Sequence, residues 1–485
     1  DRNAGEAWAL PKRSGLAGLF RRNGHKMAFR SIDRRGFLKA VAGTGVAVVS
    51  LPSLVPSSVF GATAPSERIT LGFIGCGKQS QHLMRSFLGS PGTHVVAACD
   101  VDQLKLERSS KGIVEKHYAE RNDGSYKGCA AYRDFRDLVA RPDIDAVVIS
   151  TPDHWHAVTS IEACKAGKDI YCEKPLTQTI AEARAMVNAV RKYNRVFQTG
   201  SMQRSSREFR FACELVRNGY IGDIRHVTVN VGGPPEDKPL AAEPVPDYLD
   251  WDMWVGPAMW RPYNNELAPH ISFDGFPHWR YHSYYGGGGM TDWGAHHFDI
   301  AQWGLGMDGS GPVEIIPPDG KDTKVLTYKY ANGITMTRDS QVRGPDGQGL
   351  PFPGDAYPLW LEHVRESKGS VNGVLFEGTT GKIEVNRGYL KTWPDSLKDQ
   401  VIGADKIRLY DSKNHYTDWL DAIRKRAKPI CDVEIGASSV TVCHLGNIAY
   451  TLERPLRWDP VHEVFRGDDE ANRLLSRPYR SPWQL

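Results

Sequence analysis

The stretch from Leu71 to Ser80 has the sequence LGFIGCGKQS and lies in the segment that decides the fold. The apolar run that begins at Ile69 and ends in glycine predicts a buried strand, and a helix is predicted over 79–88. The same pattern recurs as strands at 94–100, 145–151 and 169–172, with helices predicted over 103–118 and 154–166. Strands that alternate with helices at this interval predict an α/β fold with a parallel, doubly wound sheet. We assign residues 65–192 to a Rossmann domain.

The glycines of this first turn indicate what the turn binds. Gly75 permits a tight turn after the strand, and Gly77 lets the backbone approach a pyrophosphate that faces the helix N-terminus. Ser80 stands where a GxGxxG fingerprint has its third glycine. Asp100 ends the next predicted strand, where a carboxylate accepts from ribose hydroxyls and repels a 2′-phosphate, so NAD is expected rather than NADP. An ordinary glycine turn in another α/β fold is the alternative. The predicted cofactor-binding residues of the turn are Gly75, Gly77, Lys78 and Gln79.

Two later strand ends carry polar residues that would open onto the same crevice. The sequence TPDHWHA begins at Thr151 and Pro152 and contains His156, which either flanks the ribose or nicotinamide or simply caps and packs its helix. The sequence CEKP places Lys174 directly after a strand, with Glu173 able to orient its ammonium group. A Glu-Lys pair in isolation is typical of a solvated surface, so its interpretation depends on the surrounding pattern.

A Rossmann domain followed by TPxxxHA, EKP and a long second half resembles the Gfo/Idh/MocA family, which includes glucose-fructose oxidoreductase and inositol dehydrogenase. The resemblance implies a second, α+β domain over 193–460 with a large, open, mainly antiparallel sheet. It also allows the C-terminal flank of that domain to close the Rossmann domain, and leaves 461–485 as a tail. Strands with period-two character are predicted at 224–231, 325–330, 333–339 and 381–386, and helices at 412–426 and 434–452.

An aromatic, proline-rich segment over 234–285 is too irregular for a simple strand or helix prediction. Aromatic faces can stack on sugar rings, but a small loop core explains such side chains equally well. The tryptophans of the segment are Trp251, Trp254, Trp260 and Trp279.

After this segment the sequence GGGGMTDWGAHHFD begins at Gly286. Asp292 is predicted to open a helix, which would put Asp292 and His296 four residues apart on one face. In the family a DxxxH at this point supplies an acid and a histidine beside the substrate hydroxyl, and both residues match. Asp299 and its neighbour extend the pattern and either contact substrate or order the helix. The predicted substrate-binding residues are His297, Gln203 and Arg204.

Oxidation of a sugar alcohol requires a base for the proton and a group that polarises the oxygen. We predict His296 as the base, Lys174 as its electrostatic partner or as an alternative acid/base, and Asp292 as the group that holds the imidazole or the ring hydroxyls. His278 and His282 have the i,i+4 spacing of a zinc pair, but HWRYH lacks the glutamate of HExxH. We therefore predict no metal.

Residues 1–64 have the pattern of an export leader. Arg34 and Arg35 precede Phe-Leu-Lys and a short apolar run, which resembles a twin-arginine signal and is too short to span a bilayer. Residues 1–26 precede Met27, where a normal signal starts, and need not be native. We expect export of the folded protein by the twin-arginine machinery to the periplasm or the medium, with no stable membrane span afterwards.

The composition fits a globular protein of two or three domains, with 485 residues that are 40% hydrophobic and 24% charged. The formal charge of +4 comes from the leader and the remainder is mildly acidic, which argues against a nucleic-acid partner. The eight cysteines show no CxxC or framework spacing, so free core thiols are expected. An exposed face of the large sheet would need a cover, so a homodimer or homotetramer is predicted.

These patterns together predict an exported NAD(P)-dependent oxidoreductase. It would transfer hydride between a tightly bound nicotinamide and a hydroxyl of a sugar, polyol or sugar derivative. The alternative is a redox-neutral, NAD-dependent glycoside hydrolase or lyase that transiently oxidises a ring hydroxyl and eliminates a substituent. A non-catalytic sugar-binding protein on this fold would not need Lys174, Asp292 and His296 together.

Overall fold

The computed structural model describes residues 67–122, 124–339, 342–343, 349–350 and 372–485. All of them belong to one compact unit of the chain. The leader predicted over 1–64 lies outside the described residues.

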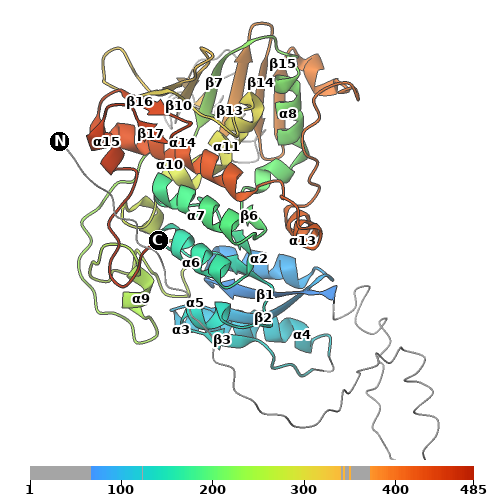
Figure 1. Ribbon diagram of the computed structural model, residues 1–485, viewed down its shortest axis with the longest axis vertical. Helices are drawn as coiled ribbons and strands as arrows, with labels where there is room; N and C mark the ends of the chain where they lie inside the picture. Colours follow the sequence, from blue (N-terminus) through green and yellow to red (C-terminus); the bar gives the residue numbers. More distant parts are fainter. Residues whose placement is uncertain (1–66, 123, 340–341, 344–348, 351–371) are drawn as a thin grey trace, which may run out of the picture. The chain divides into compact units, whose positions relative to one another are not determined.

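Six strands form an all-parallel sheet in the order β3-β2-β1-β4-β5-β6, which is the order of a Rossmann domain (Figure 1). The strands are β1 (Ile69–Ile74), β2 (Thr93–Cys99), β3 (Ala130–Tyr132), β4 (Ala146–Ile149), β5 (Asp169–Cys172) and β6 (Phe197–Thr199). The predicted parallel sheet is confirmed. It continues past residue 192, because β6 pairs with β5.

Helices cover both faces of this sheet, which is why its strands are continuous apolar runs. The helical segments are α2 (Lys78–Leu88), α3 (Gln103–Glu107), η3 (Arg108–Glu115), α4 (Lys116–Ala119), α5 (Phe135–Val139), α6 (Asp153–Lys165) and α7 (Ile180–Lys192). The helix predicted over 103–118 is one continuous segment, but its middle, η3, is a π-helix. Phe87 of α2 packs edge-on against Trp419, so a helix from the far end of the sequence completes one face.

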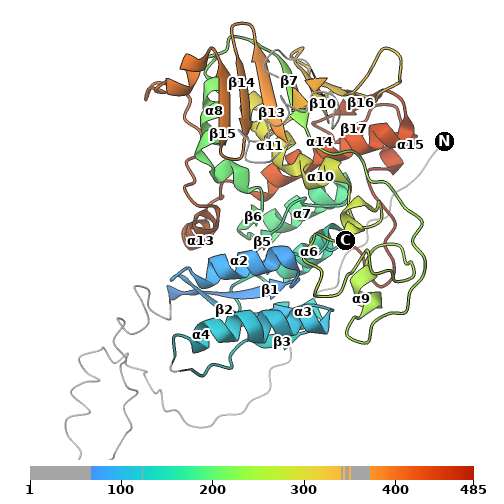
Figure 2. The ribbon, with the colours of Figure 1, turned by 180° about the vertical axis from the view of Figure 1, so that it is seen from behind.

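The second half contains a nine-stranded sheet with the order β15-β14-β13-β7-β10-β9-β8-β16-β17 (Figure 2). Its strands are β7 (Ile224–Asn230), β8 (Glu314–Ile316), β9 (Leu326–Lys329), β10 (Thr335–Asp339), β13 (Gly373–Gly378), β14 (Lys382–Asn386), β15 (Tyr389–Trp393), β16 (Leu456–Asp459) and β17 (Val464–Phe465). Only β7 and β10 pair in parallel, so the mainly antiparallel prediction is confirmed. A separate pair is β11 (Val342–Arg343) with β12 (Gly349–Leu350).

One face of this sheet is apolar and is covered by helices. Cross-strand neighbours Val227, Phe376 and Ile383 point into that core together with Met336. The opposite face carries polar side chains such as His226. The helical segments of this half are η4 (Met202–Ser205), α8 (Arg207–Arg217), α9 (Trp251–Val255), η5 (His278–Tyr281), α10 (Gly289–Asp292), α11 (Gly294–Leu305), η6 (Asp395–Asp399), α13 (His415–Lys425), α14 (Val433–Leu452) and α15 (Asp469–Arg473).

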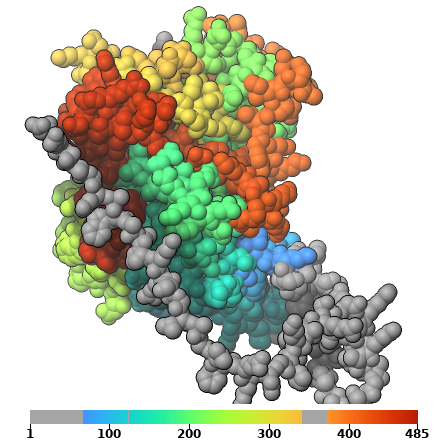
Figure 3. All heavy atoms as spheres, viewed as in Figure 1, coloured from blue at the N-terminus to red at the C-terminus, as the bar shows by residue number. Residues whose placement is uncertain are grey.

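The two halves share helices. The helix α14 contributes to the core of the nine-stranded sheet and also packs Val433 and Ala437 against the Rossmann core. In the space-filling view the orange and red atoms of the C-terminal segments lie against the green and teal atoms of the first half (Figure 3). Trp483 of the predicted tail packs on Trp155 and Phe135, so the chain's end is part of the Rossmann layer.

The aromatic segment over 234–285 forms its own small core, which is the second of the two interpretations given for its tryptophans above. Trp251 and Trp254 stack with ring centroids 4.7 Å apart, and Trp279 is buried in the same cluster. Trp260 is exposed. All eight cysteines are buried and free, as predicted. Among the described helices, none is long and apolar enough to cross a membrane.

Candidate active site

A cleft of about 490 Å³ lies where the carboxyl ends of the Rossmann strands meet residues of the second half. Strand carboxyl ends are where ligands bind in sheets of this type. The predicted residues that line it are Gly75, Gly77, Lys78, Gln79, Asp100, Thr151, Pro152, Glu173, Lys174, Asp292 and His296. The structure therefore brings together the glycine turn and the catalytic group, by which we mean the predicted residues Lys174, Asp292 and His296.

The glycine turn is shaped to admit a phosphate group. Gly75 has φ +87°, and a Cβ there would lie 2.7 Å from the backbone of Ser150 and Thr151. A Cβ on Gly77 would meet nothing within 4 Å, because this residue faces open space in the cleft. No side chain caps the N-terminus of α2, so its first N–H groups are available to an anion. These observations fit a dinucleotide pyrophosphate.

Asp100 sits at the end of β2 and lines the same cleft. Its carboxylate accepts from the Cys76 N–H at 2.6 Å and from the Asp102 N–H at 2.8 Å, which fixes its orientation. Burial raises the pKa of Asp100, although Lys105 and these N–H groups oppose the rise. A held carboxylate at this point fits a ribose diol.

Lys174 and Asp292 form the central ion pair of the cleft. The Lys174 ammonium donates to Asp292 Oδ1 at 2.7 Å and to the Asp292 carbonyl at 2.8 Å. Burial raises the pKa of Asp292, but Lys174 and Arg280 outweigh it, so the pKa lies below its usual range. Glu173 does not orient the ammonium as predicted; it accepts from Gln79 Nε2 at 3.0 Å and from the Lys174 backbone. The side chain that holds Lys174 comes instead from the second half.

His296 is buried in the wall of the cleft, on the first turn of α11. Burial lowers the pKa of its imidazole well below the usual range, and the Lys174 ammonium lowers it further. The ring is therefore neutral at pH 7. Asp292 does not open this helix as predicted: it ends the short helix α10, and α11 begins at Gly294 after a break at Trp293.

Asp153, Arg280 and Arg387 are among the charged residues that line the cleft and that the sequence did not single out. Asp153 begins α6, and burial raises its pKa well above the usual range. Arg280 stacks on Trp279 and lies 3.8 Å from Asp292 Oδ1. The TPD sequence could have indicated Asp153, but nothing local marks the two arginines, which the second half brings to the site.

The aromatic segment forms the outer wall of the cleft. Lys78, at the start of α2, pairs with Asp274 at 3.2 Å and lies 5.3 Å from the ring centroid of Phe276. Lys105, after β2, donates to the Pro269 carbonyl at 3.2 Å. The segment thus contacts the Rossmann half on both sides of the predicted dinucleotide site.

Models of one oxidoreductase family match most of the described chain. The NAD-binding Rossmann model matches residues 69–201, and the C-terminal alpha/beta domain model matches 235–348 and 364–485. The chain belongs to the Gfo/Idh/MocA oxidoreductase family. Its NAD-binding domain and its α/β second domain follow from that membership.

The chain is similar in sequence to curated relatives and in fold to solved structures. A glycosyl hydrolase family 109 protein of Shewanella baltica is 31% identical over 215 residues, which are 40% of this chain and 45% of that protein. The chain thus matches a little under half the length of this curated relative. Among solved structures, the aldose-aldose oxidoreductase of Caulobacter crescentus with glycerol has a TM-score of 0.50 at 18% identity, covering 80% of this chain and 99% of that chain. The WlbA dehydrogenase of Bordetella pertussis, with NADH and UDP-GlcNAcA, has a TM-score of 0.52 at 16% identity, with coverages of 81% and 99%.

Four predicted site residues of this family member do not line the cleft: His156, His297, Gln203 and Arg204. His156 lies between the carbonyls of Pro175, 2.8 Å from Nδ1, and Thr151, 3.0 Å from Nε2. His156 therefore packs between the segments that contain Thr151 and Pro175, which agrees with the packing role given above as its alternative. His297 is buried and stacks on Trp293, and burial lowers its pKa to about 3.

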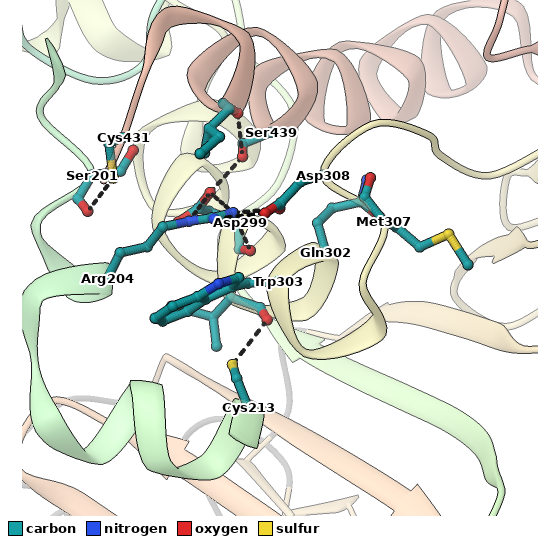
Figure 4. A network of polar contacts seen from close by, with 12 residues as sticks. Ser201, Arg204, Cys213, Asp299, Gln302, Trp303, Met307, Asp308, Cys431 and Ser439 are labelled. Carbon is teal, nitrogen blue, oxygen red and sulfur yellow. Dashed lines mark hydrogen bonds and ion pairs between the residues drawn. The ribbon is translucent and has the colours of Figure 1, made fainter. Parts of the chain in front are cut away.

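Arg204 has a structural place instead of a position at the substrate. Its guanidinium donates to Asp299 at 2.8–3.0 Å and to Asp308 at 2.7 and 2.9 Å, with Ser439 Oγ also donating to Asp299 (Figure 4). Arg204 and Asp299 are almost fully buried. The network ties η4, α11 and α14 together, and α11 carries His296. Asp299 therefore orders its helix, the second of its two predicted roles.

The two histidines of the HWRYH sequence, His278 and His282, differ in their surroundings. His282 Nδ1 lies 2.9 Å from Asp237 Oδ1 and 3.1 Å from Arg261 Nη1. His278 is exposed. Within the described part of the chain, no group of three or more His, Cys, Asp or Glu side chains is placed to hold a metal ion.

Proposed function

We propose that the protein transfers hydride between a tightly bound NAD and a hydroxyl of a sugar, polyol or sugar derivative. The observation that carries this proposal is the pair Lys174–Asp292 beside a buried, neutral His296, in the same cleft as the uncapped glycine turn. Family membership supports the oxidoreductase class, and two solved relatives of the fold are named as sugar-related oxidoreductases or dehydrogenases.

The residues that would hold the dinucleotide are Gly75, Gly77 and the N–H groups of α2 for the phosphates and Asp100 for the ribose. Bound there, NAD accepts or returns a hydride at its nicotinamide. Gln79 Nε2 donates a hydrogen bond to Glu173 Oε1 at 3.0 Å, and both residues line the cleft together with the glycine turn and Lys174.

The protein's own groups manage the proton and the oxygen charge. Because burial and Lys174 keep the His296 imidazole neutral, His296 can accept the hydroxyl proton. The Lys174 ammonium can donate to the substrate oxygen and stabilise the negative charge that develops there, while Asp292 fixes its position at 2.7 Å. Lys174 remains the alternative proton carrier if a substrate oxygen displaces Asp292 from it.

The experiment that tests this proposal begins with the purified protein. Mass spectrometry should find NAD or NADH bound, and sugars from a panel should raise the near-ultraviolet absorbance of the oxidised, loaded protein. If no dinucleotide copurifies and none binds, the proposal fails.

A second candidate function is a redox-neutral glycosidase that oxidises a ring hydroxyl transiently, eliminates a substituent and restores the hydride. The identity of 31% to a glycosyl hydrolase family 109 protein favours this candidate. Aryl glycosides separate the two: aglycone release without accumulated NADH identifies the glycosidase, and NADH accumulation without aglycone identifies the dehydrogenase.

We also propose that the protein is exported in folded form by the twin-arginine machinery to the periplasm or medium, and that it forms a dimer or tetramer. Support for export comes from Arg34, Arg35 and the short apolar run after them. Replacing both arginines by lysine should leave the protein in the cytoplasm in cell fractionation. Sedimentation of the purified protein gives its oligomeric state.

A further inference from the structure

A second cavity of about 630 Å³ adjoins the catalytic cleft, and Trp293 lines both. Its volume falls within the roughly 300–1,000 Å³ typical of small-molecule sites. Its walls include Glu236, Glu266, Tyr281 and Trp293. We propose that this adjoining cavity is a saccharide subsite, which binds a second, neutral sugar ring of the substrate next to the ring that reacts. The inference rests on the proposed function of the cleft and narrows its substrate class.

The adjoining cavity lies close enough to the catalytic group to serve one substrate. Trp293 follows Asp292 directly in the chain, and Asp292 holds Lys174 at 2.7 Å. Tyr281, which also lines the adjoining cavity, follows Arg280 directly in the chain, and Arg280 lies 3.8 Å from Asp292 Oδ1. A saccharide that places one ring against Lys174 can therefore extend its neighbouring ring past Trp293.

Hydrogen bonds that involve the backbone and the Asp237 side chain hold the walls of the adjoining cavity in place. The Glu236 N–H donates to the Tyr281 carbonyl at 2.9 Å, and the Ser283 N–H donates to Asp237 Oδ1 at 2.8 Å. His282 reaches the same Asp237 oxygen at 2.9 Å. Because the segment after β7 is fastened to the segment before the glycine run, little ordering would be needed on binding.

Gly289, the last glycine of the GGGG run, lines this cavity. A Cβ on Gly289 would lie 2.5 Å from Gly232 Cα, so the two backbones can touch only without side chains. The Met290 N–H donates to the Gly233 carbonyl at 2.9 Å across this contact. Both Gly232 and Gly289 line the adjoining cavity, so this close contact of two backbones forms part of its wall.

The chemistry of the walls suits a hydroxyl-rich ring. Glu236 and Glu266 are exposed, and among the described residues neither carboxylate accepts a hydrogen bond. Carboxylates accept strongly from sugar hydroxyls, and the exposed ring of Tyr281 offers apolar contact to ring C–H groups. The described walls carry two carboxylates, Glu236 and Glu266, against one lysine, Lys238, so their net negative charge disfavours a nucleoside diphosphate. These features favour an oligosaccharide or a glycoside of a sugar over a free monosaccharide or a nucleotide sugar.

The test compares one-ring and two-ring ligands on the dinucleotide-loaded protein. A glycan array that presents each terminal ring alone and within a disaccharide selects the ligands, and calorimetry measures their Kd. We expect at least one disaccharide to bind about tenfold or more tightly than its terminal monosaccharide, since one charge-assisted hydrogen bond suffices for this. Glu236→Gln and Glu266→Gln should each remove about three- to tenfold of the disaccharide affinity and change the monosaccharide Kd less than twofold. Glu120→Gln is the matched control. Glu120 is an exposed glutamate at the end of α4 that lines neither cavity, so its substitution should change neither Kd.

Three outcomes overturn the inference. Disaccharides that bind no more tightly than their terminal rings would show that the adjoining cavity takes no sugar. Equal losses for both ligand sizes in Glu266→Gln would place that residue at the reacting ring, and tight UDP-glucose binding weakened by Lys238→Ala would make the occupant a nucleotide. If monosaccharides still change the redox state of the bound dinucleotide, only this inference fails; if no sugar of either size binds, the proposed function fails with it.

Discussion

Two glycines of the first turn should respond in opposite ways to the same substitution. At Gly75, alanine must take φ +87°, which costs about 1–2 kcal/mol, and its Cβ must be relieved of a 2.7 Å overlap with the Ser150 and Thr151 backbone, about 1–3 kcal/mol more. Gly75→Ala should therefore lower the free energy of unfolding by about 2–5 kcal/mol. At Gly77, φ is −70° and a Cβ meets nothing within 4 Å.

For Gly77→Ala the stability effects nearly cancel. Loss of a glycine N-cap costs about 1 kcal/mol, and the stiffer unfolded chain returns about 0.4–1 kcal/mol. The methyl group instead fills the space that a pyrophosphate needs. If one charge-assisted hydrogen bond from α2 is lost, about 1.5–3 kcal/mol, the Kd for NAD rises about 10- to 150-fold.

Urea unfolding of dinucleotide-free protein measures the first quantity, and calorimetric titration with NAD measures the second. Gly309→Ala is a control, since a Cβ there also meets nothing within 4 Å but lies away from the cleft. The reasoning is refuted if Gly77→Ala binds NAD as tightly as the wild type, or if it unfolds as easily as Gly75→Ala.

Three further predictions concern charged groups. Lys174→Met should lower the rate of bound-dinucleotide reduction about 10²- to 10⁴-fold with unchanged NAD content, because it removes the ammonium group that Asp292 positions to stabilise charge on the substrate oxygen; rapid-mixing absorbance checks this, and a rate within threefold of wild type would contradict it. Arg204→Met leaves Asp299 buried without its partner and should cost about 3–5 kcal/mol in urea unfolding, while a loss under 1 kcal/mol would refute a structural role. Burial lowers the pKa of His444 from 6.5 to about 4, so its neutral form stabilises the fold above pH 6.5 and this is lost as pH falls toward 4. The free energy of unfolding should therefore fall by about 3 kcal/mol less in His444→Gln than in the wild type over that pH interval. Equal falls in the two proteins would count against the assignment.

The Rossmann half was predictable because its signals are local. The strand, the positive-φ glycine, the helix and Asp100 each follow from neighbours a few residues apart, and the structure places all of them as expected. Strands β3 and β6 and the π-helix η3 were missed, since a three-residue strand and a change of helical pitch leave little pattern in a sequence.

The active-site residues were predictable in part. Lys174, Asp292 and His296 do meet in one cleft, but the partner of Lys174 is Asp292 rather than Glu173. Arg204 carries a charge in a plausible position and yet pairs with Asp299, because burial requires a carboxylate for its guanidinium. Side-chain direction across such distances in sequence depends on packing, which no local motif records.

The sequence by itself determined the order of strands and helices, the site of the glycine turn and the identity of the reactive side chains, since hydrophobic period and backbone geometry act over a few residues. The tertiary structure alone decided which of those side chains meet: α10 and α11 bring Asp292 and His296 to Lys174 across more than a hundred residues. It also decided that Gly232 and Gly289 meet in the wall of an adjoining cavity beside Trp293, because a close approach of two backbones exists only once the second half has folded.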